Sequence, residues 1–399
     1  MPYVILNDIS YAHQDGTAAI SNLTISLSGR TGVIGQNGSG KTTLMRLIAG
    51  DLQPTDGTIR TEPDILYMPQ NLILNQSDSI AGLMGIQGKF LALRSIQAGS
   101  TDVEDFNTVA DDWDMEERTL ATLHSLDLAK NLSHTENLLE RTVGTLSGGE
   151  AMAVALAGSF IRRPSTLLLD EPTNNLDSHA REWFYGMVRQ WPGCLLVVSH
   201  DRDLLECMDA IAELRKGKLK LYGGPFSFYL KQSQLEREAA EHKVVRANAK
   251  LKQEKRLFAA DKTKAAHSAQ QGEQSRIRSR FPTAAIHMRR GYAEKNAAKQ
   301  QTAREERMDK AHAAYRDAKA AARPDEHITI ELPETTVPPD KIVLEVETPE
   351  RLFSLQGPER LALEGRNGSG KTTLLKTILG KASIQQITVR RVIPEIGPR

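Results

Sequence analysis

The sequence contains the same eight-residue pattern twice, and this duplication restricts the fold more than any other feature. The copies cover residues 35–42 and 365–372, and both fit Gly-x-x-x-x-Gly-Lys-Ser/Thr. In this pattern the glycines let consecutive backbone N–H groups turn toward one phosphate at the start of a helix. β-rich apolar segments precede the two copies at residues 31–34 and 361–363, and helical segments follow at residues 43–49 and 373–379. The sequence therefore predicts two phosphate-binding loops, each between a strand and a helix.

The match between the two copies extends beyond the octet, because residues 35–50 and 365–380 agree at 11 of 16 positions. Lys41 and Lys371 are expected to reach the β- and γ-phosphates, while the hydroxyls of the threonines that follow them bind Mg²⁺. The predicted nucleotide contacts are Gly35, Asn37, Gly38, Ser39, Gly40, Lys41, Thr42 and Thr43 in the first loop, and Gly365, Asn367, Gly368, Ser369, Gly370, Lys371, Thr372 and Thr373 in the second.

The bulk composition limits the class of protein. A chain of 399 residues allows two or three domains, and its longest apolar runs are too short to span a bilayer. Two cysteines fit a reducing compartment and exclude a disulfide framework. No basic-then-apolar leader begins the chain. We therefore expect a cytoplasmic protein without a membrane segment.

Two motifs between the loops carry further chemistry. Residues 166–171 read as a buried strand ending in Asp170, which is expected to hold Mg²⁺, and Glu171, which is expected to polarise the attacking water. Residues 147–149 (Ser-Gly-Gly) open a helical segment at residues 151–160 and form a second anion-binding helix start. Since one γ-phosphate does not need two such starts from one domain, this turn is expected to close over nucleotide held by another copy of the domain.

In this order, the motifs resemble an ATP-binding cassette nucleotide-binding domain over residues 1–225. The residues that carry the resemblance are the first loop, Leu146-Ser147-Gly148-Gly149-Glu150, residues 167–177 and residues 197–201. The resemblance implies that Tyr11 stacks on adenine. It also implies that Gln70 contacts Mg²⁺ or the attacking water, and that His200 contacts the γ-phosphate. Asp177 would lie at the seam between two cassettes.

Two positions depart from the cassette pattern, and one stretch of the first domain has no chemical motif. Glu150 stands where glutamine is commoner, and Ala153 where arginine is usual. The apolar spacing between residues 75 and 140 predicts a small helical subdomain. Its acidic run is expected to be solvated surface rather than a metal site. The acids are Asp102, Glu104, Asp105, Asp111, Asp112 and Asp114.

A basic segment follows the first domain. Residues 231–323 hold 23 Lys+Arg and 11 Asp+Glu, although the whole chain is nearly neutral. The segment favours helix until Gly272 and the Phe-Pro pair at residues 281–282, so we expect two long antiparallel helices with a tip near residues 268–284. Arginines and aromatics at the tip suit phosphates and unstacked bases of RNA. They are Arg276, Arg278, Arg280, Phe281, Arg289, Arg290 and Tyr292.

Tandem cassettes joined by a charged helical hairpin resemble the ABC-F family. Residues 171–177 and 222–229 are particularly similar to that family. Membership implies an ATPase, with ATP and Mg²⁺ as its cofactors. It also implies ribosome binding through rRNA and tRNA along linker 231–323, in translation or in antibiotic protection. The expected architecture is α/β: a P-loop NTPase cassette at 1–228, a helical hairpin at 229–325 and part of a second cassette at 326–399.

The second cassette is expected to be incomplete. Ser147 lies 106 residues after Lys41, which would place a second signature turn near position 477. We therefore expect exposed apolar surface in this part, and ATP hydrolysis that is weak unless chains pair in trans. Two other functions remain open at this point: the ATP-binding subunit of an ABC transporter, and a non-catalytic RNA-binding remnant.

Overall fold

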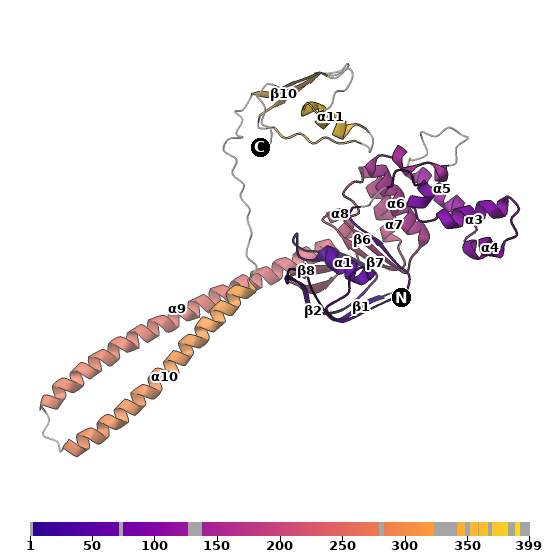
Figure 1. Cartoon of the computed structure of the whole chain (residues 1–399). Helices are drawn as coiled ribbons and strands as arrows, with labels where there is room; N and C mark the ends of the chain where they lie inside the picture. Colours follow the sequence, from indigo (N-terminus) through magenta and orange to yellow (C-terminus); the bar gives the residue numbers. More distant parts are fainter. Residues whose placement is uncertain are drawn as a thin grey trace. The chain divides into compact units, whose positions relative to one another are not determined.

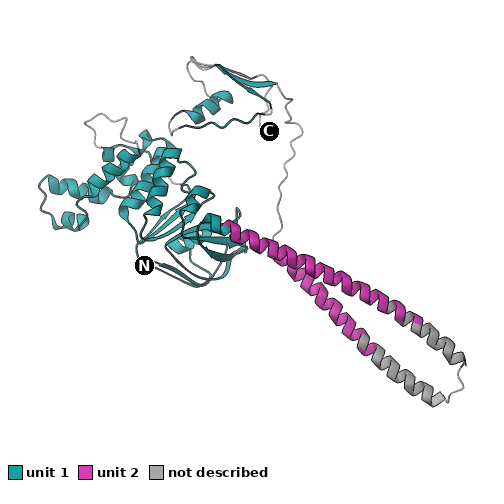
Figure 2. Cartoon of the chain, turned by 180° about the vertical axis from the view of Figure 1, so that it is seen from behind, with its two compact units in different colours: residues 1–229, 331–399 teal, residues 230–330 magenta. Residues whose placement is uncertain are grey.

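The computed structural model separates the chain into two compact units, residues 1–229 with 331–399, and residues 230–330 (Figure 2). The structure describes residues 3–71, 75–126, 138–278, 283–322, 341–347, 352–357, 359–365, 369–381 and 388–391. Of the helical side chains between 262 and 300, it describes only those of residues 263, 264, 267, 298 and 299.

A six-stranded sheet forms the centre of residues 1–229 (Figure 1). Its strands, in spatial order, are β5 (Ile65–Met68), β6 (Thr166–Asp170), β7 (Cys194–Val198), β3 (Arg30–Ile34), β8 (Ala210–Arg215) and β9 (Lys218–Gly223). The first five strands are parallel, and β9 is antiparallel to β8. Strands β6 and β7 are buried on both faces, which explains their unbroken apolar sequences. Because parallel strands end at one edge, the loops after β3, β6 and β7 meet there.

A second, antiparallel sheet covers one face of the first. It consists of β2 (Ala18–Ser28), β1 (Tyr3–Ala12) and β4 (Asp56–Thr61). Helix α1 (Lys41–Ala49) shares a hydrophobic core with this sheet, with Leu168 of β6 and with Leu196 of β7. The neighbouring residues Leu167 and Leu195 belong to the core on the opposite face. This alternation follows from the period of two in a strand, and it fixes the phosphate loop between two packed layers.

Helices cover the other face of the central sheet. The helices of this part of the chain are α2 (Ile80–Leu83), α3 (Gln87–Gln97), α4 (Val103–Val109), α5 (Met115–Ser125), α6 (Gly148–Arg162), α7 (Ser178–Arg189) and α8 (Arg202–Glu206), with 3-10 turns at Leu138–Glu140 and Val143–Thr145. Of these, α3 and α4 project away from the sheet (Figure 1). Helix α6 is buried on nearly all sides, and α2, α3 and α7 contribute side chains to the same core. The predicted helical subdomain is present as α2–α5.

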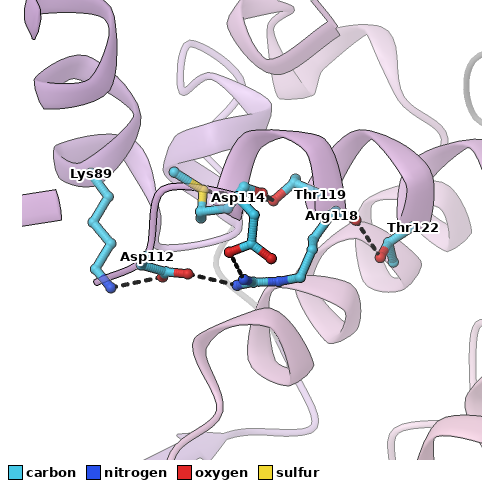
Figure 3. Close-up of polar contacts among 7 residues, drawn as sticks. Lys89, Asp112, Asp114, Arg118, Thr119 and Thr122 are labelled. Atoms are coloured by element: carbon cyan, nitrogen blue, oxygen red, sulfur yellow. Dashed lines mark hydrogen bonds and ion pairs between the residues drawn. The ribbon is translucent and has the colours of Figure 1, made fainter. Parts of the chain in front are cut away.

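The acidic run of this subdomain lies at the surface as predicted, because four of its six acids are exposed and the other two are half-buried, and some of these acids also form ion pairs. The Arg118 guanidinium bridges Asp112 (2.8 Å) and Asp114 (2.5 Å), and Lys89 lies 2.9 Å from Asp112 (Figure 3). Burial of Asp112 acts against its charge, but hydrogen bonds from Lys89 and Arg118 hold the pKa of this carboxyl below its usual value. Asp102 caps α4 by accepting from the Glu104 N–H. Among the described residues, no group of acids, histidines or cysteines is arranged to hold a metal ion.

Two long helices form the hairpin, as predicted, and they are drawn as its two arms in Figures 1 and 2. Helix α9 runs over Phe226–Arg278 and α10 over Thr283–Ala321. Leu251 and Ala311 are buried, and Arg304 of α10 lies 3.2 Å from Asp261 of α9. The predicted tip began too early, because α9 continues through Gly272. A single glycine costs about 1 kcal/mol, which does not break a helix of this length. Arg280 and Phe281 lie outside the described residues, as do the side chains of the other predicted tip residues.

The last part of the chain contains β10 (Ile342–Glu347), β11 (Leu352–Gln356), α11 (Lys371–Ile378) and β12 (Thr388–Arg391), with the strands in the order β11-β10-β12. The strand predicted at residues 361–363 is absent, which corrects that prediction. Its equivalent, β3, is held by β7 and β8 on either side, and among the described residues no strand pairs with 361–363. Leu361 and Leu363 are therefore exposed, which confirms the expected apolar surface.

Candidate nucleotide-binding site

The first phosphate loop has the backbone that its sequence predicts. Gly38 and Gly40 have φ angles of 77° and 97°, a left-handed conformation that glycine adopts without strain. Gly40 is the N-cap residue of α1, and its position provides no side-chain hydrogen bond to the helix start. The first N–H groups of α1 are therefore not capped from that position and can bind an anion.

Two polar side chains of the loop, Lys41 and Ser39, are positioned to bind a phosphate. The Lys41 Nζ donates to the carbonyl oxygens of Gly35 (2.8 Å) and Gln36 (3.1 Å). Burial lowers the pKa of this ammonium, although the carboxylates of Glu171 and Asp170 act in the opposite direction. The Ser39 Oγ is buried and has no hydrogen-bond partner among the described residues. A phosphate in the loop would satisfy both groups, since buried polar atoms are rarely left unpaired.

Thr42 and Asp170 form a pair of oxygen ligands suited to Mg²⁺. The Thr42 Oγ1 donates to the Asp170 Oδ2 at 2.7 Å, which joins the start of α1 to the end of β6. Asp170 is only 2% exposed, and burial raises the pKa of its carboxyl despite the Thr42 hydrogen bond and the Lys41 charge. A divalent cation would offset this desolvation, and hydroxyl and carboxylate oxygens are the ligands that Mg²⁺ prefers. These residues fit the predicted metal.

Glu171 and His200 face each other across the ends of β6 and β7. The His200 Nε2 lies 3.5 Å from the Glu171 Oε1. The Glu171 N–H donates to the Val198 carbonyl (2.8 Å), and Glu171 has a φ of 51°, an unusual conformation for a residue with a side chain. Burial raises the pKa of the Glu171 carboxyl, with the nearby His200 opposing the rise. Backbone strain and a carboxyl made more basic by burial are typical of functional sites.

These groups line one cavity of about 510 Å³, whose residues come from the loops after β1, β3, β5, β6 and β7. The lining residues are His13, Asn37, Gly38, Gly40, Lys41, Thr42, Thr43, Gln70, Asp170, Glu171, Asn174, Val198 and His200. The structure thus brings most of the predicted first-loop contacts together with all three predicted catalytic residues.

Gly35 and Ser39 of the loop do not line this cavity, and neither does Tyr11, the predicted adenine contact. Tyr11 lies within β1 and packs its half-buried ring against the core, while the neighbouring His13 lines the cavity. The two rings meet edge to face, with centroids 5.5 Å apart. The sequence analysis overlooked His13 because it favoured the tyrosine of the same segment. Simple alternation along β1 gave no signal for this, because the register shifts between Leu6 and Ile9 and brings Tyr11 to the core side of the strand.

The Ser-Gly-Gly turn opens α6 as predicted, and Glu150 has a structural role that the sequence analysis missed. The Ser147 side chain accepts from the Glu150 N–H (3.3 Å), and the Glu150 Oε2 accepts from the Ser147 N–H (2.7 Å). This reciprocal pair is a capping box, which needs glutamate or glutamine at that position. Glu150 therefore keeps the turn in the helix-start geometry that Gly148 and Gly149 require. The second departure, Ala153, is buried in the helical core.

The second phosphate loop repeats the local geometry of the first. Gly370 is the N-cap residue of α11 with a φ of 86°, and the Lys371 Nζ donates to the Gly365 carbonyl at 2.5 Å. Thr372 and Thr373 lie in the first turn of α11, and Ser369 is part of the described loop. The predicted contacts Asn367 and Gly368 lie outside the described residues. The described part of this loop therefore matches the first loop in the features that favour a phosphate.

Comparison with known proteins agrees with this site. The family model described as "ABC transporter" matches residues 19–174 and 351–392, which include both phosphate loops and the Asp170–Glu171 strand end. Both stretches are therefore identified as ATP-binding cassette sequence. The chain is 29% identical to the tylosin resistance ATP-binding protein TlrC of Streptomyces fradiae, over 91% of this chain and 69% of that protein.

Two other relatives confirm the predicted resemblance to ABC-F proteins. ABC transporter F family member 4 of Arabidopsis thaliana is 27% identical over 90% of this cassette chain and 50% of its own length. The energy-dependent translational throttle protein EttA of Mycobacterium tuberculosis is 27% identical over 94% of this chain and 63% of its own length. The chain thus spans from half to about two thirds of the length of these curated relatives.

Solved cassette structures are also similar to this chain. A structure described as the ATP-binding subunit of an ABC transporter has 20% sequence identity and a TM-score of 0.43, and the match covers 58% of this chain and 93% of that one. None of the described helices is long and apolar enough to cross a membrane.

Proposed function

We propose that the first cassette binds ATP with Mg²⁺ and hydrolyses it. The observation that supports this most directly is the single cavity shared by Lys41, Thr42, Asp170, Glu171 and His200. The phosphate loop would hold the β- and γ-phosphates through backbone N–H groups and Lys41. Glu171 would accept the proton of the attacking water, a task for which its raised pKa makes it a better base.

Thr42, Gln70 and Asp170 would hold the metal ion, because all three line the cavity. When bound, Mg²⁺ would neutralise charge that develops on the phosphate oxygens. The His200 ring, which lies 3.5 Å from the Glu171 carboxylate, would donate a hydrogen bond to the γ-phosphate and keep Glu171 oriented. The Asp177 side chain caps α7 by accepting from the Ala180 N–H at 2.9 Å, and this places the predicted seam residue at a helix start.

We further propose that ATP binding controls attachment of this chain to the ribosome in the cytoplasm. The support is the basic hairpin of α9 and α10, since residues 231–323 carry 23 basic against 11 acidic residues. A positive excess of this size favours a polyanion such as rRNA or tRNA. The names of two relatives, a tylosin resistance protein and a translational throttle protein, are consistent with this partner.

Co-sedimentation of the whole chain with ribosomes tests both parts. Glu171→Gln should trap ATP and increase pelleting with ATP, whereas Lys41→Ala should remove the ATP effect because the lysine that holds the phosphates is lost. Neutralising hairpin lysines and arginines to glutamine should weaken pelleting and reduce its dependence on salt. Pelleting that is equal with and without ATP would contradict ATP control and favour an RNA-binding remnant. Copurification with a membrane protein instead of ribosomes would favour a transporter subunit.

A further inference from the structure

Two side chains on one face of helix α7 form hydrogen bonds with the loops after β6 and β7, which carry the candidate catalytic groups Glu171 and His200. Arg181 and Tyr185 are four residues apart on α7, so both project from one side of the helix. The Arg181 guanidinium donates to the Thr173 carbonyl at 3.1 Å. The Tyr185 hydroxyl donates to the Asp201 Oδ2 at 2.6 Å. One contact thus reaches the segment after Glu171, and the other reaches the residue after His200.

Asp201 makes most of the hydrogen bonds that hold the loop after β7. Its other carboxylate oxygen accepts from the backbone N–H groups of Asp203 (3.1 Å) and Leu204 (3.2 Å), so it caps α8. The Asp201 N–H in turn donates to the Ser199 Oγ at 3.0 Å, and Ser199 is fully buried. His200 therefore lies between two residues whose positions are fixed. Of these two, Asp201 depends on a side chain from another element, namely Tyr185.

The His200 side chain itself has little packing to hold it, because it is 60% exposed. Its position beside Glu171 must then come largely from its backbone. In the first cassette, Glu171 is anchored through its N–H to the Val198 carbonyl (2.8 Å), at the end of the same strand, β7, that leads into the His200 loop. A shift of this loop would alter the 3.5 Å contact between the His200 Nε2 and the Glu171 carboxylate, and displacements of 1 Å can reduce a rate about a hundredfold.

We propose that Tyr185 is a positioning residue for the reaction of the first cassette, which acts through Asp201 to hold His200 beside Glu171. The proposal rests on the proposed ATPase function. Burial and the Asp201 hydrogen bond raise the pKa of the Tyr185 phenol, so this hydroxyl remains a donor throughout the neutral range. Arg181 secures the other loop from the same helix. Movement of α7, whose N-cap is the predicted seam residue Asp177, would therefore be transmitted to both catalytic groups.

Tyr185→Phe tests the proposal because it removes only the hydroxyl. We expect a fall in kcat for ATP hydrolysis of about tenfold or more, with little change in KM, because the phosphate loop is untouched. Amide hydrogen exchange of residues 199–204 should become faster, since Asp201 loses one of its partners. Tyr222→Phe is the matched control, because the Tyr222 hydroxyl also donates to a carboxylate (Glu213, 3.3 Å) but lies away from this loop. The control should change neither readout.

The outcomes separate this inference from the proposed function. If the wild-type chain hydrolyses ATP and Tyr185→Phe leaves kcat or the exchange of residues 199–204 unchanged, the positioning role is wrong and the ATPase function stands. A fall in kcat accompanied by a comparable rise in KM would show a general structural effect and would also overturn the proposal. The same defect in the Tyr222→Phe variant would have the same meaning. If the wild-type chain does not hydrolyse ATP, the proposed function fails and the positioning role fails with it.

Discussion

At the scale of single residues, the first cassette places two buried carboxyls next to each other at the end of β6 and makes both more basic. Burial raises the pKa of Asp170 and of Glu171, although Thr42 or His200 stabilises the charged form of each. At Asp170, a bound metal ion can compensate for the loss of hydration. At Glu171, the raised pKa makes the carboxylate a better acceptor for a proton from water. The same feature predicts how the reaction depends on pH.

The rate of ATP hydrolysis should fall on the acid side with a midpoint above 4.5, the ordinary value for a glutamate. The carboxyl must be ionised to act as a base, and its pKa in the folded chain is raised, so protonation inactivates it at a higher pH than usual. The measurement is kcat against pH at saturating MgATP, with ATP binding followed in parallel to exclude loss of substrate. Glu171→Gln should lower kcat by about 10² to 10⁴ at neutral pH and should abolish the fall on the acid side, because the group that titrates is gone. A midpoint at or below 4.5 would contradict the assignment of Glu171 as the base.

His13 and Tyr11 give a second residue-scale prediction. His13 lines the nucleotide cavity and Tyr11 does not, so His13→Ala should weaken ATP binding about tenfold through loss of ring stacking on the base. Tyr11→Ala should mainly lower the melting temperature, because its half-buried ring packs on the core. Titration with a fluorescent ATP analogue and thermal unfolding of both variants distinguish the two roles. The reverse pattern would restore the assignment made from the sequence.

At the scale of secondary-structure elements, the sequence correctly predicted the strands that pair with neighbours among the described residues. The segments that became β3 and β6 have apolar runs that match buried parallel strands, and both pair with β7. The equivalent apolar run at residues 361–363 has the same local character but forms no strand. A strand is completed by its neighbours, so local sequence alone did not decide between these cases. The capping role of Glu150 was missed although the Ser-x-x-Glu spacing is local, and the start of the hairpin tip was predicted too early because one glycine does not end α9.

Close packing of α6 on α2 gives a prediction at this scale. A Cβ atom added to Gly158 of α6 would lie 2.5 Å from both the Cα and the carbonyl oxygen of Met84, just after α2. Because backbone cannot move aside as a side chain can, Gly158→Ala should reduce the free energy of unfolding by about 1–3 kcal/mol. Gly186→Ala on α7 is the control, since nothing lies within 4 Å of its added Cβ. That control should be neutral or stabilise by about 0.5–1 kcal/mol, as alanine favours helix more than glycine does.

Chemical denaturation of both variants measures this difference, with the slope against denaturant checked for two-state behaviour. Equal stability of the two variants would mean that α2 and α6 do not approach as closely as the structure shows. Nucleotide binding should be retained in both, because neither glycine lies in the cavity.

At the scale of the whole molecule, the chain holds two phosphate loops but one Leu-Ser-Gly-Gly-Glu turn. The first cassette contains both the cavity at Lys41 and the turn at Ser147, in separate loops. The sequence predicted these parts residue by residue, since each depends on local glycine geometry. Which phosphate loop meets the turn depends on association of cassettes, and that information is not contained in any short motif. It can be decided by experiment.

We predict that hydrolysis at Lys41 requires the Ser147 turn of a second copy of the chain. Lys41→Ala removes the phosphate contact, and Ser147→Asp places a negative charge against the γ-phosphate while retaining the cap of α6, since aspartate is a good N-cap residue. Each variant alone should be inactive, whereas a mixture should recover at most about a quarter of the wild-type rate. Random pairing makes half of the dimers mixed, and each mixed dimer has one intact site.

The same hypothesis predicts how the wild-type rate depends on concentration. Specific activity should rise with protein concentration, because the active species is a pair of chains. Lys371→Ala should leave that activity unchanged, since the second loop takes no part in the paired site. Three results together would assign the turn to the second phosphate loop of the same chain. The specific activity would stay constant on dilution, mixing would give no recovery, and Lys371→Ala would lose activity. The two phosphate loops would then differ in function in spite of their shared sequence, because only one of them lies opposite the turn.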